Sequence, residues 1–84
     1  MHSDAAPSTI ADSLKASVEA RIPEAIVEVT SSGGGHYSLV VRSAVFRDRS
    51  KLECHRLVYA AIAPFMSGRE PPVHAIDTLT TIVS

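Results

Sequence analysis

Two β-branched runs separated by a glycine-rich segment constrain the fold of this chain more than any other feature. The first run is AIVEVT, residues 25–30, and the second is HYSLVVRS, residues 36–43. Between them lies SSGGG, residues 31–35, whose three glycines suit a reversal of the chain. We therefore predict an antiparallel hairpin with a loop of about five residues. Alternation along the second strand places every second residue from Tyr37 to Val41 on one face.

A helical pattern precedes the hairpin. Thr9 followed three residues later by Asp12 resembles a capping box, with aspartate in place of glutamate. An apolar residue then recurs at every fourth position from Ile10 to Val18, which is typical of an amphipathic helix. Pro23 has no N–H to continue the helix. The pattern therefore predicts a helix that begins at residue 8 or 9 and ends before Pro23.

A second helix is predicted after the hairpin, over LECHRLVYAAIA, residues 52–63. Ser50 and Glu53 supply a capping box at its start. Pro64 has no N–H to donate to the carbonyl of Ala60, so it is expected to kink or end this helix near Ala60. The apolar side chains at three- and four-residue spacing predict the buried face. That predicted face consists of Leu52, His55, Val58, Tyr59 and Ile62.

The remaining segments complete the order of elements. AVFRDRSK, residues 44–51, reads as a helical turn and a loop, 67–72 as a turn-rich link, and VHAIDTLTTIV, residues 73–83, as a final strand. Because a helix joins the second strand to the third, we expect those two strands to run parallel. The fold class predicted is α+β, a two-layer sandwich of a three-stranded mixed sheet with helices on one face, in the order α-β-β-α-α-β.

Length and composition exclude several classes of protein. With 84 residues the chain has room for one domain, which we assign to residues 8–84 after a disordered tail at residues 1–7. A net charge of −1 gives no overall electrostatic attraction to nucleic acid or to an anionic membrane. No apolar run reaches the roughly 18 residues of a membrane helix. The single cysteine, Cys54, excludes an intramolecular disulfide and fits a reducing compartment. We expect a cytoplasmic location, with mitochondrial or nuclear location as alternatives.

No catalytic machinery is apparent in the sequence, so we do not expect an enzyme. Paired carboxylates, a nucleophile with a base at a suitable spacing and a phosphate-binding loop before a helix are all missing from the pattern. The histidines are the side chains that could take part in chemistry, as metal ligands. His74, in PPVHAID, residues 71–77, is either a polar structural residue or a metal ligand, because imidazole suits iron when thiolates supply the other sites.

The order and spacing of four segments make the chain similar to the BolA family. These segments are GHY (35–37), SAVF (43–46), CHRLVY (54–59) and PVHAI (72–76), and the resemblance spans about residues 9–80. It implies the type II KH-like fold, which has the same order of elements as the pattern above. Cys54 departs from the arginine usual in the family. The Gly-x-x-Gly loop of nucleic-acid-binding KH domains is also missing, since SSGGG lies inside a hairpin.

The resemblance also implies a function. BolA-like proteins are non-catalytic adaptors that bind a monothiol glutaredoxin and share a [2Fe–2S] cluster with it, in iron–sulfur cluster trafficking or iron sensing. The partner's cysteine and a glutathione bound on the glutaredoxin side supply thiolates. A homodimer without the partner is an alternative assembly, and no membrane partner is expected.

The resemblance assigns His74 as the main cluster ligand. The family's other ligand is a histidine or cysteine in or near the first hairpin loop, where His36 is the sole ligand-capable side chain; the alternative is a surface histidine at a strand start. His55 is interpreted as a hydrogen-bonded core residue or as a partner that orients a ligand.

A basic segment supports a second functional class. It holds five of the eight basic residues within 15 positions, against two acidic ones, and so carries a local charge of +3. It could be a solvated turn, a surface for an acidic protein, or a contact for phosphate groups of nucleic acid. A nucleic-acid-binding transcriptional regulator is therefore the alternative function. The basic residues are Arg42, Arg47, Arg49, Lys51 and Arg56.

Overall fold

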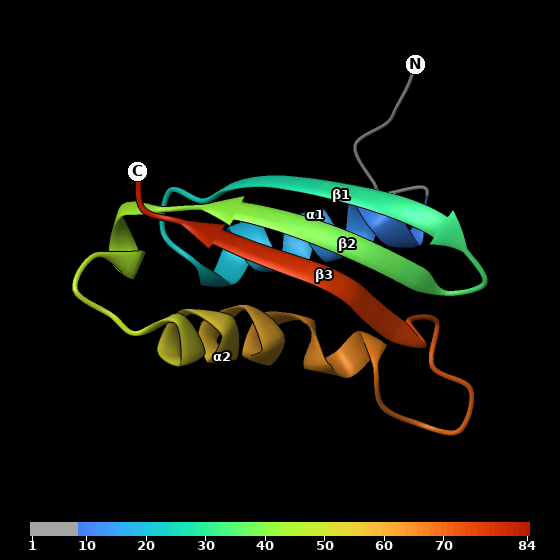
Figure 1. The fold of residues 1–84 in the computed structure, drawn as a ribbon. Helices are drawn as coiled ribbons and strands as arrows, with labels where there is room; N and C mark the ends of the chain where they lie inside the picture. The colour runs from blue at the N-terminus through green and yellow to red at the C-terminus, as the bar shows by residue number, and fades with distance from the viewer. Residues whose placement is uncertain (1–8) are drawn as a thin grey trace, which may run out of the picture.

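Three strands form one mixed sheet with β2 in the middle (Figure 1). In this computed structural model, which describes residues 9–84, β1 is Ile26–Gly33, β2 is His36–Arg42 and β3 is Ala75–Ile82. β1 pairs with β2 antiparallel, whereas β3 pairs with β2 parallel. The predicted mixed sheet and its parallel pair are confirmed. The tail predicted for residues 1–7 lies outside the described residues.

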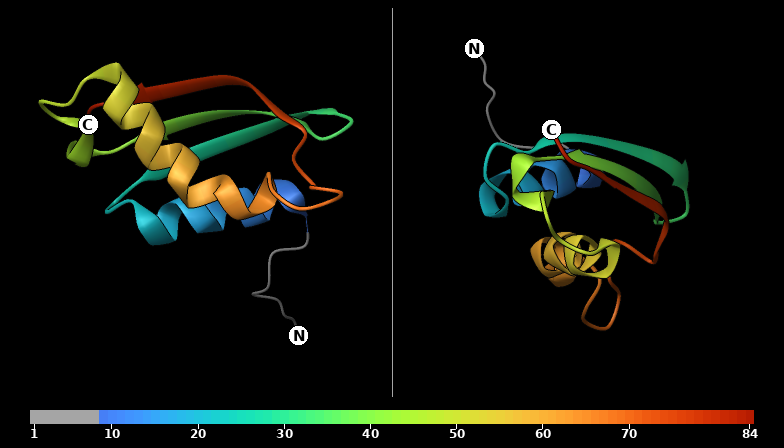
Figure 2. Two further views of the ribbon diagram at one scale, coloured as in Figure 1. Left: turned by 90° about the horizontal axis from the view of Figure 1, so that it is seen from below. Right: turned by 60° about the vertical axis from the view of Figure 1, so that its left-hand side comes forward.

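Two helices cover one face of the sheet, as both views in Figure 2 show. α1 spans Ile10–Arg21 and α2 spans Lys51–Ile62. The first of the two helices predicted between β2 and β3 is a three-residue 3-10 turn, η1, at Ala44–Phe46. A second turn, η2, at Ala63–Phe65, continues from α2. The two-layer α+β sandwich predicted from the sequence is therefore confirmed.

The hydrophobic core lies between the sheet and the helices. Alternate residues of β2, beginning with Tyr37, point into it, as the alternation predicts. Its largest fully buried side chains come from every layer of the molecule, and removing them from water is the main force that holds the two layers together. They are Phe46, Leu14, Leu39, Ile62, Val18, Val41, Val58 and Val73.

Both helices begin at the predicted caps. The Thr9 hydroxyl accepts a hydrogen bond from the Asp12 amide at 3.0 Å. At α2 the capping box is complete, because the Ser50 hydroxyl accepts from the Glu53 amide at 3.1 Å and the Glu53 carboxylate accepts from the Ser50 amide at 2.9 Å. These bonds satisfy amides that have no partner inside the helix.

The predicted buried face of α2 is wrong at two positions. Leu52 is 59% exposed and Tyr59 is 39% exposed. The helix is instead turned so that Cys54 and Ala61 face the core with Val58 and Ile62. Small side chains let two helices approach closely, and the Ser17 hydroxyl of α1 donates to the Ala61 carbonyl at 2.6 Å. Close packing against α1 therefore selects this face.

The hairpin loop is shorter than predicted. β1 continues to Gly33, and the chain reverses over Gly34 and Gly35, whose φ angles of 66° and 80° are those of a tight two-residue turn. A β-bulge between Ser31 and Gly33 leaves Ser32 without a pairing residue on β2. The bulge takes up the residue that would otherwise lengthen the loop.

The boundaries around Pro64 and His74 also differ from the prediction. α2 reaches Ile62, two residues beyond Ala60, before the chain tightens into η2 around Pro64. β3 begins at Ala75 rather than at residue 73. Val73 is 1% exposed and its amide donates to the Phe65 carbonyl. It therefore belongs to the buried end of the segment before β3 and does not pair with β2.

Ser43 ties together the end of the sheet opposite the hairpin turn. Its side chain is fully buried; the hydroxyl donates to the Pro23 carbonyl at 2.8 Å and accepts from the Val45 amide at 3.1 Å. Its backbone N–H donates to the Ile82 carbonyl, and its carbonyl accepts from the Ser84 amide. One small polar residue thus joins the segments that flank the three strands at this end.

Replacing Ser43 with alanine is expected to destabilise the protein by about 1–3 kcal/mol, because a carbonyl and an amide are left without their partner. Urea unfolding measures the change in the free energy of unfolding. Ser67→Ala, at an exposed serine in the link before β3, is the control and is expected to leave it unchanged. Equal stability of the two variants would contradict the assigned role of Ser43.

Candidate metal centre

The backbone of Gly35 holds the start of β3 against the hairpin turn. Its carbonyl accepts the amide of His74 at 2.8 Å and that of Ala75 at 3.3 Å. These two bonds lie at the point where β3 enters the parallel ladder. The position of His74 is therefore determined by main-chain bonds to the turn and does not depend on its own side chain.

The His74 imidazole lies directly over Gly35. A Cβ atom built on this glycine would stand 3.0 Å from Cδ2 of the ring and 3.1 Å from Cγ, closer than most Cβ atoms approach other groups. Gly35 also has a φ of +80°, which a residue with a side chain rarely adopts. Glycine is thus favoured at this position for two reasons: the turn requires a positive φ, and the His74 ring leaves little room for a side chain. The His74 residue as a whole is exposed to solvent.

His36 lies beside His74 at the same end of the sheet. It is the first residue of β2 and pairs with Ala75, the chain neighbour of His74. The Cα atoms of the two histidines are therefore within about 9 Å of each other. Both residues are exposed. The fold brings together two candidate ligands that lie on different strands and far apart in the chain.

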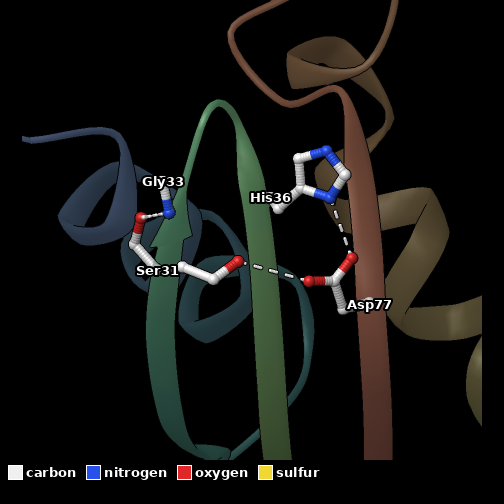
Figure 3. A network of polar contacts seen from close by, with 5 residues as sticks. Ser31, Gly33, His36 and Asp77 are labelled. Carbon is white, nitrogen blue, oxygen red and sulfur yellow. Dashed lines mark hydrogen bonds and ion pairs between the residues drawn. The ribbon is translucent and has the colours of Figure 1, made fainter.

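Asp77 holds the His36 ring. Its Oδ1 lies 3.0 Å from Nδ1 of His36, and its Oδ2 accepts from the Ser32 hydroxyl at 3.3 Å (Figure 3). The hydrogen bond with His36, more than any other interaction, lowers the pKa of the Asp77 carboxyl from its ordinary value. The side chains of His36 and Asp77 lie on the face of the sheet away from the helices (Figure 3).

Sequence reasoning missed Asp77, which lies one residue beyond the PVHAI segment. No regular register could have found it, because Asp77 is an extra residue in the ladder between β2 and β3. Ser32 could not have been found either, because it comes into contact with Asp77 through the bulge in β1.

His55 takes no part in this cluster. It is partly buried on α2, and its Nε2 is buried with no hydrogen-bond partner among residues 9–84. This differs from the expected hydrogen-bonded core histidine. No hydrogen bond joins it to His36 or His74 in this part of the chain. The carboxylate of Asp77 orients a candidate ligand instead.

The basic segment lies at the other end of the sheet. Arg42 ends β2, whereas His36 begins it, so the strand separates the two regions (Figure 1). All five basic side chains are exposed. Two of them also bond to the backbone: Arg49 Nε donates to the Val45 carbonyl at 2.9 Å and Arg47 to the Ser84 carbonyl at 3.4 Å. The predicted site residues therefore lie on two separate surfaces, with His36 and His74 at one end of the sheet and the basic segment at the other.

The described chain offers too few donors for a complete metal site. No group of three or more His, Cys, Asp or Glu side chains within residues 9–84 is placed to hold a metal ion. The thiol of Cys54 is buried in the core. Two exposed imidazoles nevertheless suit a site whose remaining ligands come from a second molecule, because imidazole binds iron together with thiolates.

Comparison with known proteins identifies the family of this chain. A family model described as BolA-like protein matches residues 8–83. The chain belongs to the BolA-like family. No curated protein sequence matches it.

Solved structures of BolA proteins share the fold. The mouse BolA1 protein is 26% identical, with a TM-score of 0.70 over 99% of this chain and 72% of that one. A BolA homologue from Coxiella burnetii is 28% identical, with a TM-score of 0.66 over 82% and 85% of the two chains. A Bol-like protein from Babesia bovis is 30% identical, with a TM-score of 0.60 over 82% and 83%.

The helices of this BolA-like chain give no sign of a membrane span. In residues 9–84, neither helix has the length and apolar character needed to cross a bilayer.

Replacing Gly35 with alanine is expected to cost about 1–3 kcal/mol of stability from backbone strain and also to displace the His74 ring. Gly33→Ala is the matched control, because Gly33 also has a positive φ but nothing lies within 4 Å of an added Cβ. Histidine side-chain NMR resonances report the displacement. We expect His74 resonances to shift in Gly35→Ala and not in Gly33→Ala; similar spectra would show that the ring does not rest on this glycine.

Proposed function

We propose that this BolA-like chain is a non-catalytic adaptor that binds a monothiol glutaredoxin and shares a [2Fe–2S] cluster with it. The observation that carries the proposal is the placement of His36 and His74, both exposed and side by side at the hairpin turn. The role that follows is iron–sulfur cluster trafficking or iron sensing in the cytoplasm.

The two imidazoles are the donors this chain contributes. His74 is the main ligand, since its backbone is anchored to Gly35 and its ring lies over the turn. His36 is the second ligand and is oriented by Asp77. A cysteine of the glutaredoxin and a glutathione bound to it supply thiolates. Ligation by histidine and thiolate together gives a cluster whose redox potential differs from that of an all-cysteine cluster.

The glutaredoxin is expected to dock at the hairpin turn. Both histidines must face the partner's thiolates, and the residues around them are small and polar: Ser32, Gly33 and Gly34 are all exposed. Small residues allow a second protein to approach the imidazoles closely. The basic segment, at the opposite end of the sheet, is then left free in the complex.

We predict that His74→Ala reduces cluster retention in the heterocomplex at least about 10-fold, since even residues that only orient ligands contribute that much. Visible absorption and circular dichroism of the reconstituted complex measure it. His36→Ala is expected to change the spectrum as well but to retain more cluster. His2→Ala, which removes an imidazole near the N-terminus, is the control. A heterocomplex spectrum unaffected by His74→Ala would refute the ligand assignment.

Nucleic-acid binding is the second candidate function. The observation that favours it is the exposure of all five basic side chains on a surface remote from the histidines. Such a surface could contact phosphate groups while the hairpin turn is occupied. The bonds of Arg47 and Arg49 to backbone carbonyls compete with phosphate for those guanidinium groups.

The triple variant with Arg47, Arg49 and Lys51 changed to alanine separates the two candidates. Under the adaptor proposal it leaves the cluster spectrum unchanged. If nucleic acid binds, the slope of log affinity against log salt falls by up to about 0.9 for each phosphate group that the variant no longer neutralises. Fluorescence anisotropy with labelled DNA and RNA between low and physiological salt measures that slope. Absence of salt-dependent binding by the unmodified protein would remove this candidate.

A further inference from the structure

One β-bulge lies at Asp77 and a second lies at Ser32. In the ladder between β2 and β3, Tyr37 pairs with Ile76 and Ser38 pairs with Thr78, so Asp77 is an extra residue on β3. In the ladder between β1 and β2, Ser32 is extra in the same way. A bulge redirects the side chain of its extra residue. The two extra residues then meet through a hydrogen bond from Ser32 to Asp77. The Asp77 carboxylate lies on the sheet face that bears His36 (Figure 3).

The hydrogen bond between His36 and Asp77 decides which ring nitrogen is free. An ionised carboxylate can only accept hydrogen bonds, so the proton between Nδ1 and Oδ1 belongs to the imidazole. In a neutral ring the lone pair then lies on Nε2. Figure 3 shows this second nitrogen directed away from Asp77, toward the end of the sheet where β3 begins. That end also carries His74.

The Ser32 bond fixes the carboxylate in turn. The Ser32 hydroxyl donates to Oδ2, which leaves Oδ1 for His36. Each carboxylate oxygen therefore has its own donor, and the plane of the carboxylate is set from two strands. A carboxylate that accepts from a histidine orients the ring and raises its strength as a ligand, and such residues affect metal affinity strongly.

We propose that Asp77 is a positioning residue that holds His36 with Nδ1 protonated and Nε2 free as a metal ligand, with Ser32 steadying the carboxylate. The inference rests on the proposed function for the identity of the metal group, but the state of the ring is a property of this chain alone. It also identifies a residue outside the segments that carry the resemblance to BolA proteins.

The state of His36 is tested first, in the protein without metal. Long-range ¹H–¹⁵N NMR correlations distinguish the two neutral forms of each ring. We expect His36 with its proton on Nδ1 in the unmodified protein and in Asp77→Asn, whose amide oxygen can still accept the bond. Asp77→Ala is expected to lose that preference. Glu28→Ala, which removes another exposed carboxylate from the same sheet face, is the matched control and is expected to keep it.

The effect on ligation is tested with two probes. The first is Zn²⁺ added to the protein alone, followed at the His36 nitrogens, for which Asp77→Ala is expected to weaken binding about 10-fold. The second is the reconstituted glutaredoxin complex, from which Asp77→Ala is expected to lose the cluster about 10-fold faster. Glu28→Ala should match the unmodified protein in both measurements.

The possible outcomes separate this inference from the proposed function. If the complex holds no cluster even with the unmodified protein, the proposed function fails, and the Zn²⁺ measurement alone decides the role of Asp77. The inference is overturned if His36 carries its proton on Nε2, or if Asp77→Ala weakens neither probe. A loss of stability in Asp77→Ala with unchanged Zn²⁺ affinity would mean that the interaction only supports the fold, which also overturns it.

Discussion

The main-chain contact between Gly35 and the start of β3 is the constraint on which the candidate site depends. One carbonyl accepts the amides of both His74 and Ala75, and it can do so only because the turn places Gly35 at a positive φ with no side chain in the way. The contact sets where β3 joins β2. The positions of His74 and Asp77 relative to His36 follow from this junction and from the pairing of β3 with β2.

The two ends of the sheet differ in structure. At the hairpin turn, glycines and bulges leave the backbone exposed and present polar side chains to solvent. At the opposite end, Ser43 is buried and fully hydrogen-bonded, and it joins β2 to the segments before β1 and after β3. An end closed by hydrogen bonds and an open end carrying histidines are what the proposed adaptor, meeting its partner at one tip, requires. The basic segment, beside the closed end, belongs to a separate surface.

Much of the fold could be predicted because local patterns and tertiary packing agree. The capping residues Thr9 and Ser50 begin helices as expected, and alternation in β2 determines its buried face. The prediction failed where two faces of one helix were both plausible. α2 carries apolar side chains on two overlapping faces, one with Ala61 and one with Leu52 and Tyr59. Close packing against α1 buries the face with Ala61 and leaves Leu52 and Tyr59 exposed. Periodicity alone does not distinguish two overlapping stripes.

The sequence by itself determined the order of the elements, the parallel third strand and the two histidines worth considering as ligands, because these follow from periodicity, from turn residues and from resemblance. Only the tertiary structure decided that His36 and His74 are neighbours, that Gly35 lies beneath one ring and that Asp77 holds the other. The physical reason is register. A bulge of one residue changes which side chains meet across a sheet, and no local pattern in this sequence marks the bulges at Ser32 and Asp77.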